Sequence, residues 1–293
     1  MSILMQTWAS TSEGRLLRAG LPNVFTEVQT VFGSCPAAGG TSFAAAQTVT
    51  DKWGSNASVR QFLGGLQAPN YPATSKIVHI SFNSTGLPTA SLIAGALDSS
   101  IAAWAAALTV PTGTVLVCEW MHEMDSKYRK SQITLADGIA GKNRFYDVVR
   151  ANVSSGIADQ VKVAATYTGW LFEALDPSLY SAVRADWLGV DFDGVDANSS
   201  GVYPPWTNTL ATVESWVDTL GYGGWCAPEF GSPRWSGDTD GSSRGAWMLS
   251  MGQQMKNLNA EYVAAFEYPT DGAAFELTTT AEISSWASLC ALS

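Results

Sequence analysis

Two short segments of the chain hold the side chains best suited to chemistry. In residues 119–125, with the sequence EWMHEMD, three acids, a histidine and an indole follow an apolar run. In residues 225–231 a lone acid, Glu229, ends a second apolar run. Burying a carboxylate costs several kcal/mol unless the group is paired, so a lone acid there favours a functional role. For the first segment the structural alternative is a polar strand end paired by hydrogen bonds, and for the second it is a helix-capping or ion-paired Glu.

Glu123 and Glu229 are the two acids that could act as a pair. They are 106 residues apart (229 − 123), close to three strand–helix units of about 37 residues each. Two carboxylates that face one cleft, with aromatic platforms nearby, are what hydrolysis of a glycosidic bond requires. One must be protonated to release the leaving oxygen, and the other must be charged to attack the anomeric carbon. The charge of one raises the pKa of the other, which keeps the acid protonated near neutral pH.

Short β-rich runs alternate with polar loops and helical patterns along the whole chain. The expected strands are residues 16–20, 59–63, 77–82, 114–119, 161–168, 187–191, 224–228 and 262–267. Eight strand–helix units predict an α/β fold with parallel strands, closed as a (β/α)8 TIM barrel. We expect a single domain over residues 1–293, with residues 1–14 as an N-terminal arm. An open doubly wound sheet usually shows GxGxxG after its first strand, whereas Leu21, Pro22 and Asn23 stand here.

Helical periodicity lies between most of these strands. One apolar stripe has spacings of 4, 4, 3 and 4 and consists of Ile93, Leu97, Ile101, Trp104 and Leu108. A second stripe with spacings of 3, 4 and 3 ends at Gly221, a natural helix C-cap, and consists of Leu210, Val213, Val217 and Leu220.

Alternation within the strands predicts which side chains face the barrel axis. In residues 77–83, His79, Ser81 and Asn83 can face inward while the apolar residues between them face the helices. In residues 187–193, Asp191 and Asp193 face inward by the same rule. Polar residues at the carboxyl ends of barrel strands are where active sites are built.

Four segments together resemble glycoside hydrolase family 26, a clan A barrel family of β-mannanases and related enzymes. They are HEMD at 122–125, APEFGS at 227–232, WLGVD at 187–191 and VHISF at 78–82, and the matches spread in order over about residues 77–268. The resemblance implies retaining hydrolysis, with Glu123 as acid/base and Glu229 as nucleophile. Two positions depart from the family: Glu119 stands where an Arg is common, and a Tyr of the sixth strand has no clear match. Mannan specificity is therefore not carried over.

Aromatic and polar residues near the expected strand ends are candidates for substrate contact. His122 could orient a carboxylate or touch sugar hydroxyls, and tryptophans could stack on sugar rings, although core packing is the commoner use of any single Trp. The candidate substrate-binding residues are His122, Trp120, Asp191, Asp193, Trp170, Trp206, Trp235 and Tyr268.

Composition excludes several classes of partner. Only 14% of residues are charged and the net charge is −10, whereas binding phosphates requires a basic surface. We therefore expect no nucleic acid or anionic membrane as partner. The longest apolar run, residues 101–110, is about half of the 18 residues that a membrane span needs, so no membrane insertion is expected. Residues 1–10 show no signal-peptide pattern.

Motifs for cofactors and metals are also missing. The sequence holds neither GxSxG nor GxxxxGK[ST], and Ser126 stands where a zinc-protease motif after His122 needs a second histidine. The acids of residues 191–196 fall at positions 1, 3 and 6 of an EF-hand loop, but Val202 occupies position 12. We expect no cofactor and no metal. Four widely spaced cysteines give no disulfide framework, and Cys118 and Cys226 are interpreted as small buried side chains.

The sequence thus predicts a retaining glycoside hydrolase: an endo-acting, mannanase-like enzyme that cleaves a neutral β-linked polysaccharide or oligosaccharide by double displacement. One alternative is a virion-associated depolymerase of a bacterial surface polysaccharide, acting outside the cell after lysis, which the missing signal-peptide pattern and low charge suit. The alternative from another class is a barrel that binds carbohydrate without cleaving it. A binding module needs aromatic platforms but not two opposed acids, so the acid pair favours the enzyme.

Overall fold

The structure is a computed structural model, and it forms two compact units that each combine separate parts of the chain. The first unit is Met1–Glu27, Thr168–Glu173 and Gly189–Ser293, and the second is Val28–Tyr167 and Ala174–Leu188. The described residues are 2–5, 31–32, 48–50, 56–58, 77–82, 89–108, 110, 112, 115–172, 180–193, 201–265, 269–270, 273–275 and 277–290.

The second unit contains three parallel strands in the order β7-β6-β5. They are β5 (Ile77–Phe82), β6 (Val115–Trp120) and β7 (Val161–Thr168). β5 pairs with β6 along its whole length, from Ile77 opposite Val115 to Phe82 opposite Trp120. Because the strands are parallel, their carboxyl ends lie at one edge of this sheet. A separate antiparallel sheet consists of β2 (Val31–Phe32), β3 (Thr48–Thr50) and β4 (Asn56–Ser58).

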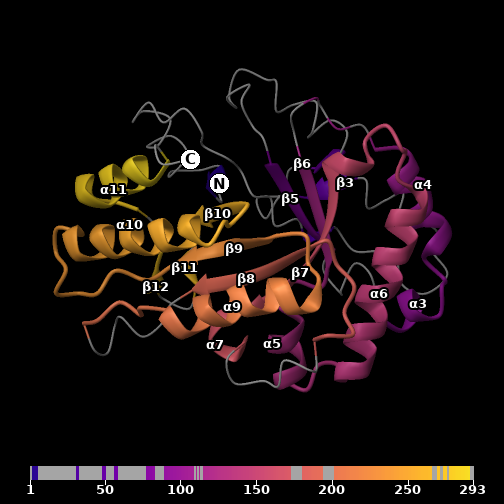
Figure 1. The fold of residues 1–293 in the computed structure, drawn as a ribbon, viewed down its shortest axis with the longest axis horizontal. Helices are drawn as coiled ribbons and strands as arrows, with labels where there is room; N and C mark the ends of the chain where they lie inside the picture. The colour runs from indigo at the N-terminus through magenta and orange to yellow at the C-terminus, as the bar shows by residue number, and fades with distance from the viewer. Residues whose placement is uncertain are drawn as a thin grey trace. The chain divides into compact units, whose positions relative to one another are not determined.

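Helices cover this sheet and bury the predicted apolar stripe from Leu97 to Leu108, while Ile93 is partly exposed. They are α3 (Thr89–Ile93), α4 (Asp98–Ala106), α5 (Met124–Arg129), α6 (Leu135–Asn152) and the 3-10 turn η2 (Ala158–Gln160). α6 contacts β6, α3 and α4, and α4 lies beside α6 in Figure 1. Phe82 of β5 packs on Trp104 of α4 and Phe145 of α6, with ring centroids 5.1 and 5.2 Å away. This contact confirms that the apolar face of β5 meets the helices.

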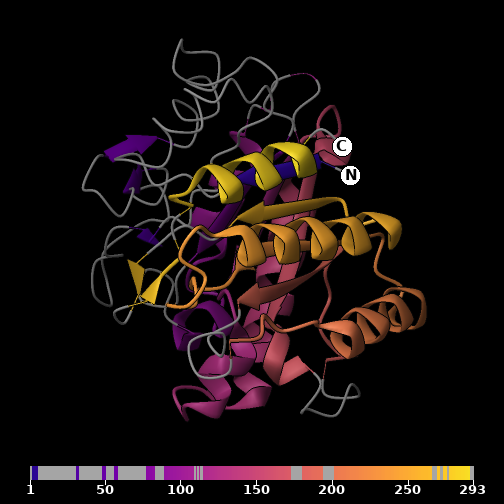
Figure 2. The same cartoon turned by 90° about the vertical axis from the view of Figure 1, so that its left-hand side faces the viewer.

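The first unit contains the strand order β1-β10-β9-β8. The strands are β1 (Ser2–Met5), β8 (Trp187–Asp193), β9 (Trp225–Gly231) and β10 (Tyr262–Ala265). β10 is parallel to both β1 and β9. The helices are α7 (Gly169–Phe172), α9 (Thr207–Leu220), α10 (Ser242–Asn257) and α11 (Thr280–Cys290), and β11 (Pro269–Thr270) pairs with β12 (Ala273–Ala274). α10 and α11 lie side by side, and α11 also contacts β1 (Figure 2).

The expected alternation of parallel strands and helices is confirmed in both units. The expected strands at 77–82, 114–119, 161–168, 187–191, 224–228 and 262–267 correspond to β5 to β10, with ends that shift by up to three residues. The expected strands at 16–20 and 59–63 lie outside the described residues. Within the expected N-terminal arm, Ser2–Met5 forms β1 and pairs with β10, and a single domain over residues 1–293 stays a prediction. Closure into eight strands stays a prediction.

Two details of the helices differ from a simple periodic pattern. The stripe from Ile93 to Leu108 is divided between α3 and α4, because Gly95 lies in the left-handed region with a φ of 76°. Gly221 ends α9 with a φ of 75°, as expected of a C-cap. Among the helices that the structure describes, none is both long enough and apolar enough to cross a bilayer. Cys118 and Cys226 are fully buried, which confirms their interpretation as core side chains.

Candidate active site

Strand β6 ends in a backbone conformation that few residues adopt. Met121 has a φ of 59° and Glu123 a φ of 50°, and His122 lies between them. A non-glycine residue in the left-handed region costs on the order of 1 kcal/mol or more. The bonds that hold the backbone of this segment include those from the Met121 N–H to the Phe82 carbonyl, over 2.8 Å, and from the Lys127 ammonium to the His122 carbonyl, over 3.1 Å. Strain of this kind collects at functional sites, so it supports a functional role for this segment.

Directly before this segment, the carboxylate of Glu119 is completely buried inside the second unit. Its contacts are Ser81 Oγ at 2.9 Å and His79 Nε2 at 3.2 Å on β5, His122 Nδ1 at 2.7 Å, the Thr166 N–H and Oγ1 at 3.0 Å on β7, and Lys142 Nζ at 3.6 Å on α6. Sequence analysis counted Glu119 among the acids of this strand end and as a departure from the family pattern, but gave it no role. Because its side chain has no exposed surface, Glu119 does not reach a sugar.

The charges around Glu119 decide its protonation. Burial alone would raise the pKa of Glu119, but the charge and hydrogen bond of His122, the bond from His79 and the charge of Lys142 together hold it well below its ordinary value. Burial lowers the pKa of Lys142, and Glu119 opposes that change. Lys142 Nζ also donates to the Trp120 carbonyl over 3.0 Å. Glu119 is therefore a charged carboxylate whose buried charge is compensated by its neighbours.

Glu123 stands where the buried strand gives way to helix α5. Its side chain is half-buried, while Met124 and Asp125, the next two residues, are completely buried. The Glu123 carbonyl accepts from the Lys127 N–H over 3.3 Å, which closes the first turn of α5. Glu123 thus lies on a fixed backbone and, as a residue, is partly exposed.

In the first unit, Glu229 lies on β9 and Asp191 on the neighbouring strand β8. The Glu229 N–H donates to Asp191 Oδ1 over 2.9 Å. Glu229 is 6% exposed and Asp191 is completely buried. Phe230 packs on Trp247 of α10, with ring centroids 5.0 Å apart, and successive residues of a strand point to opposite faces. Phe230 therefore fixes β9 to the helices, and Glu229 points to the other face of the sheet.

The loop after β9 carries Trp235 in a fixed position. A side chain at Gly201 or Gly237 would overlap the indole of Trp235, so both glycines allow the ring to lie close to the backbone. The Trp235 N–H donates to Tyr203 Oη over 3.3 Å, and Tyr203 Oη donates to Asp238 Oδ2 over 2.8 Å. Trp235 remains half-buried, with part of its ring accessible.

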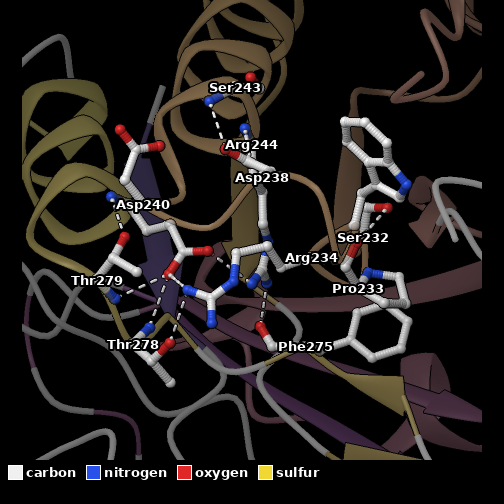
Figure 3. A network of polar contacts seen from close by, with 12 residues as sticks. Ser232, Pro233, Arg234, Asp238, Asp240, Ser243, Arg244, Phe275, Thr278 and Thr279 are labelled. Atoms are coloured by element: carbon white, nitrogen blue, oxygen red, sulfur yellow. Dashed lines mark hydrogen bonds and ion pairs between the residues drawn. The ribbon is translucent and has the colours of Figure 1, made fainter. Parts of the chain in front are cut away.

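A polar network anchors this loop to α10 and α11 (Figure 3). Asp238 accepts from the N–H groups of Ser243 and Arg244, over 3.1 and 2.8 Å, and so caps α10. Arg244 is buried, donates to the Phe275 carbonyl, and pairs with Glu282 at 3.2 Å. Sequence reasoning missed this network. The sequence T-x-x-E at residues 279–282, a capping box at the start of α11, was the signal that could have found part of it.

The fold was compared with those of solved structures. The chain is similar to a family 26 β-mannanase from Bacteroides ovatus, with 12% identity, a TM-score of 0.52, and coverage of 80% of this chain and 72% of that one. It is similar to the β-glycosidase of Thermosphaera aggregans, with 10% identity, a TM-score of 0.59, and coverage of 96% and 84%. It is also similar to a broad-specificity family 5 endoglucanase from Bacteroides salanitronis, with 12% identity, a TM-score of 0.58, and coverage of 95% and 83%.

The chain resembles the clan A glycoside hydrolases. At 10–12% identity this likeness is one of fold. No protein-family model matches the sequence, and no curated protein matches it. The similarity to these solved structures shows that the strand–helix alternation in each of the two units is of the kind found in barrel enzymes.

The expected aromatic platforms differ in how far they are exposed to solvent. Trp120 is 1% exposed and its ring fills the space beside Gly141 of α6. This corrects the expectation of sugar contact, because the indole belongs to the core. Trp170 on α7 is 45% exposed. Trp206 is half-buried before α9 and meets Phe192 edge-on at 5.7 Å.

Two further candidates cannot be placed. Tyr268 lies outside the described residues, and of Asp193 the structure describes the backbone at the end of β8.

Proposed function

We propose that the protein is a retaining, endo-acting glycoside hydrolase that cleaves a neutral β-linked polysaccharide, with Glu229 as nucleophile and Glu123 as acid/base. The observation that carries the proposal is the position of these acids. Each lies at or near the carboxyl end of a strand, β6 or β9, in a fold shared with a mannanase, a glycosidase and an endoglucanase. In a closed barrel, those strand ends form the active-site mouth.

The reaction would proceed by double displacement. In the first step, Glu123 gives its proton to the glycosidic oxygen as that bond breaks, and a carboxylate oxygen of Glu229 bonds to the anomeric carbon. In the second step, Glu123, now charged, takes a proton from water, and the water oxygen displaces Glu229. Each step inverts the anomeric carbon, so the overall reaction retains its configuration.

The surroundings of each acid suit these roles. The Glu229 backbone is held by Asp191, so the nucleophile needs little reorganisation when it attacks. The accessible carboxyl group of Glu123 can meet both the leaving group and the incoming water. Asp191 is completely buried, and we assign it to positioning Glu229.

The net negative charge of the protein and its accessible tryptophan rings both favour a neutral substrate. The net charge of −10 would repel an acidic polysaccharide. The accessible rings of Trp170 and Trp235, and in part that of Trp206, offer flat apolar faces for sugar rings. We keep β-mannan as the first substrate to examine, with His122, Asp193 and Tyr268 as further contacts.

The proposal is tested by turnover on a panel of β-mannan, β-glucan, xylan and bacterial surface polysaccharides, followed by the release of reducing ends. Glu229→Gln should abolish activity on every substrate, and Glu214→Gln, at an exposed position of α9, is the matched control that should retain it. Proton NMR during early hydrolysis should show a product that keeps the anomeric configuration. Sugar binding without turnover by the unaltered protein would favour the carbohydrate-binding alternative, and an inverted product would remove Glu229 as nucleophile.

A further inference from the structure

Both histidines of the chain contact the same carboxylate oxygen. His79 Nε2 lies 3.2 Å and His122 Nδ1 lies 2.7 Å from Glu119 Oε1. His79 is fully buried on β5, whereas His122, two residues after the end of β6 and directly before Glu123, has a side chain that is 13% exposed. Glu119 therefore joins the core of the second unit to the residue that precedes the proposed acid/base.

The other contacts of Glu119 fix the direction in which its carboxylate points. Ser81 Oγ and Thr166 Oγ1 both bond to Oε1, and the Thr166 N–H donates to Oε2 over 3.0 Å. Lys142 Nζ stands 3.6 Å from Oε2. Oε1 accepts from residues of β5 and β7, and Oε2 accepts from β7 and lies near the ammonium group on α6. The carboxylate therefore cannot rotate without breaking several of these contacts. The position of His122 is thus set by a rigid acceptor.

A charged carboxylate accepts hydrogen bonds and donates none. The 2.7 Å contact between Glu119 and His122 therefore requires the proton of His122 to sit on Nδ1. In the neutral ring, Nε2 is then the acceptor, and in the protonated ring Nε2–H becomes a donor. Which of these forms is present depends on the negative charge that Glu119 places against the ring.

We propose that Glu119 is a positioning residue that holds His122 in the Nδ1–H form and, through it, orients the proposed acid/base Glu123. Its catalytic consequence rests on the proposed function, whereas the state of the His122 ring does not. His122 directly precedes Glu123, and the residues on either side of His122 have left-handed φ values of 59° and 50°, so we assign the coupling between the ring and the acid to this constrained backbone.

Other charges face the same histidine and must be included in any pH dependence. Within the second unit, His79 on β5 and Lys142 on α6 contact Glu119, and Lys127 on α5 donates to the His122 carbonyl. Asp125 on α5 acts on Lys142 through its charge, and Glu123 directly follows His122. Lys142 and Lys127 are cations and disfavour a second positive charge on His122, whereas Glu119 lies nearest and favours it. Removing the charge of Glu119 should therefore make His122 lose its proton at a lower pH.

The first measurement needs no variant. Because the chain has only two histidines, two-bond proton–nitrogen correlation spectra of the ¹⁵N-labelled protein contain only two imidazole patterns. His122→Asn assigns them by removing one. We expect the His122 pattern to show Nδ1–H when the ring is neutral. A neutral His122 with its proton on Nε2 would overturn the proposal.

The second measurement compares Glu119→Gln with the matched control Thr166→Val. The first keeps the shape of residue 119 but offers an amide, and the second removes one donor to Glu119 while its charge remains. In Glu119→Gln we expect the midpoint of His122 titration to fall and the ring to move to the Nε2–H form, and in Thr166→Val we expect neither change. An unchanged tautomer and midpoint in folded Glu119→Gln would contradict the proposal.

The kinetic measurement separates this inference from the proposed function. If the protein hydrolyses a polysaccharide, Glu119→Gln should lower kcat on the order of tenfold with KM nearly unchanged, and shift the alkaline limb of the pH profile to lower pH. Equal kcat and pH profiles in Glu119→Gln and the unaltered protein would remove its catalytic role. If no substrate of the panel is cleaved, the proposed function fails, and the NMR result still decides the role of Glu119 toward His122.

Discussion

The N–H of Glu229 donates to the carboxylate of Asp191 over 2.9 Å, so the proposed nucleophile is tied to the neighbouring strand β8 by its own backbone. Because this bond uses the backbone N–H, it fixes the strand at Glu229 without occupying a carboxylate oxygen of that residue. Asp191 is completely buried, which leaves positioning as the main contribution of this acid.

Asp191→Asn tests this tie. The amide oxygen can still accept from the Glu229 N–H, but without charge, and the amide nitrogen must find an acceptor in a buried site. We expect kcat to fall about tenfold with a smaller change in KM, as for a misplaced reacting group. Steady-state kinetics check this, with exposed Asp147→Asn on α6 as the control. Equal losses in both variants would argue against a specific role.

Glu123→Ala tests the acid/base assignment. The loss should be far larger on a natural polysaccharide than on an aryl glycoside with a good leaving group, which needs no protonation. Azide should then restore turnover of the activated substrate, because a small anion can attack the glycosyl-enzyme without a base. Both effects are measured by release of the aryl group. Equal losses on the two substrates would reject the assignment.

Acid should weaken the fold through Glu119. Its pKa in the folded protein is well below the value of 4.5 that it has when unperturbed, so the unfolded chain binds the proton first. The stabilisation is therefore fully present above about pH 5 and is lost as the pH falls through 4.5 toward the folded pKa. Urea unfolding at a series of pH values measures the free energy of unfolding of the unaltered protein and of Glu119→Gln. The difference between the two should shrink as the pH falls through this range. An advantage independent of pH would contradict the linkage.

Arg244 should contribute more to the free energy of unfolding than an exposed arginine does. It pairs with Glu282 in the interior, and removing one partner of a buried pair costs about 3–5 kcal/mol. We expect Arg244→Ala to lower the free energy of unfolding by this amount in urea titrations. Arg184→Ala breaks the exposed pair with Asp147 and should cost less than about 1 kcal/mol. Similar losses in the two variants would show that burial does not control the effect.

Sequence pattern predicted much of the framework, because local rules decide it. β5 and β7 begin and end where alternation of β-branched residues places them, and Gly221 ends α9 as a left-handed C-cap. The break between α3 and α4 escaped prediction. The apolar spacing continues through it, and only the φ of 76° at Gly95 turns the chain.

The candidate site was less predictable, because its contacts join residues far apart in sequence. Ser81 and Thr166 are 38 and 47 positions from Glu119, and no local pattern reports that three strands place them together. Trp120 follows the acid directly, but a strand's alternation sends its indole into the core beside Gly141. Residue type alone identified the acids and aromatic residues as candidates. Only the packing shows that Glu119 and Trp120 are buried, whereas other candidates are accessible to solvent.

The pairing of β1 with β10 has a consequence for synthesis on the ribosome. Ser2 lies opposite Tyr262, so the strand made first must wait for about 260 further residues before its partner exists. Sheet contacts of such long sequence separation form slowly, and a strand without its partner exposes backbone groups that can pair with other chains. Residues 2–5 are only a short strand, which limits that exposure while the rest of the chain is being made.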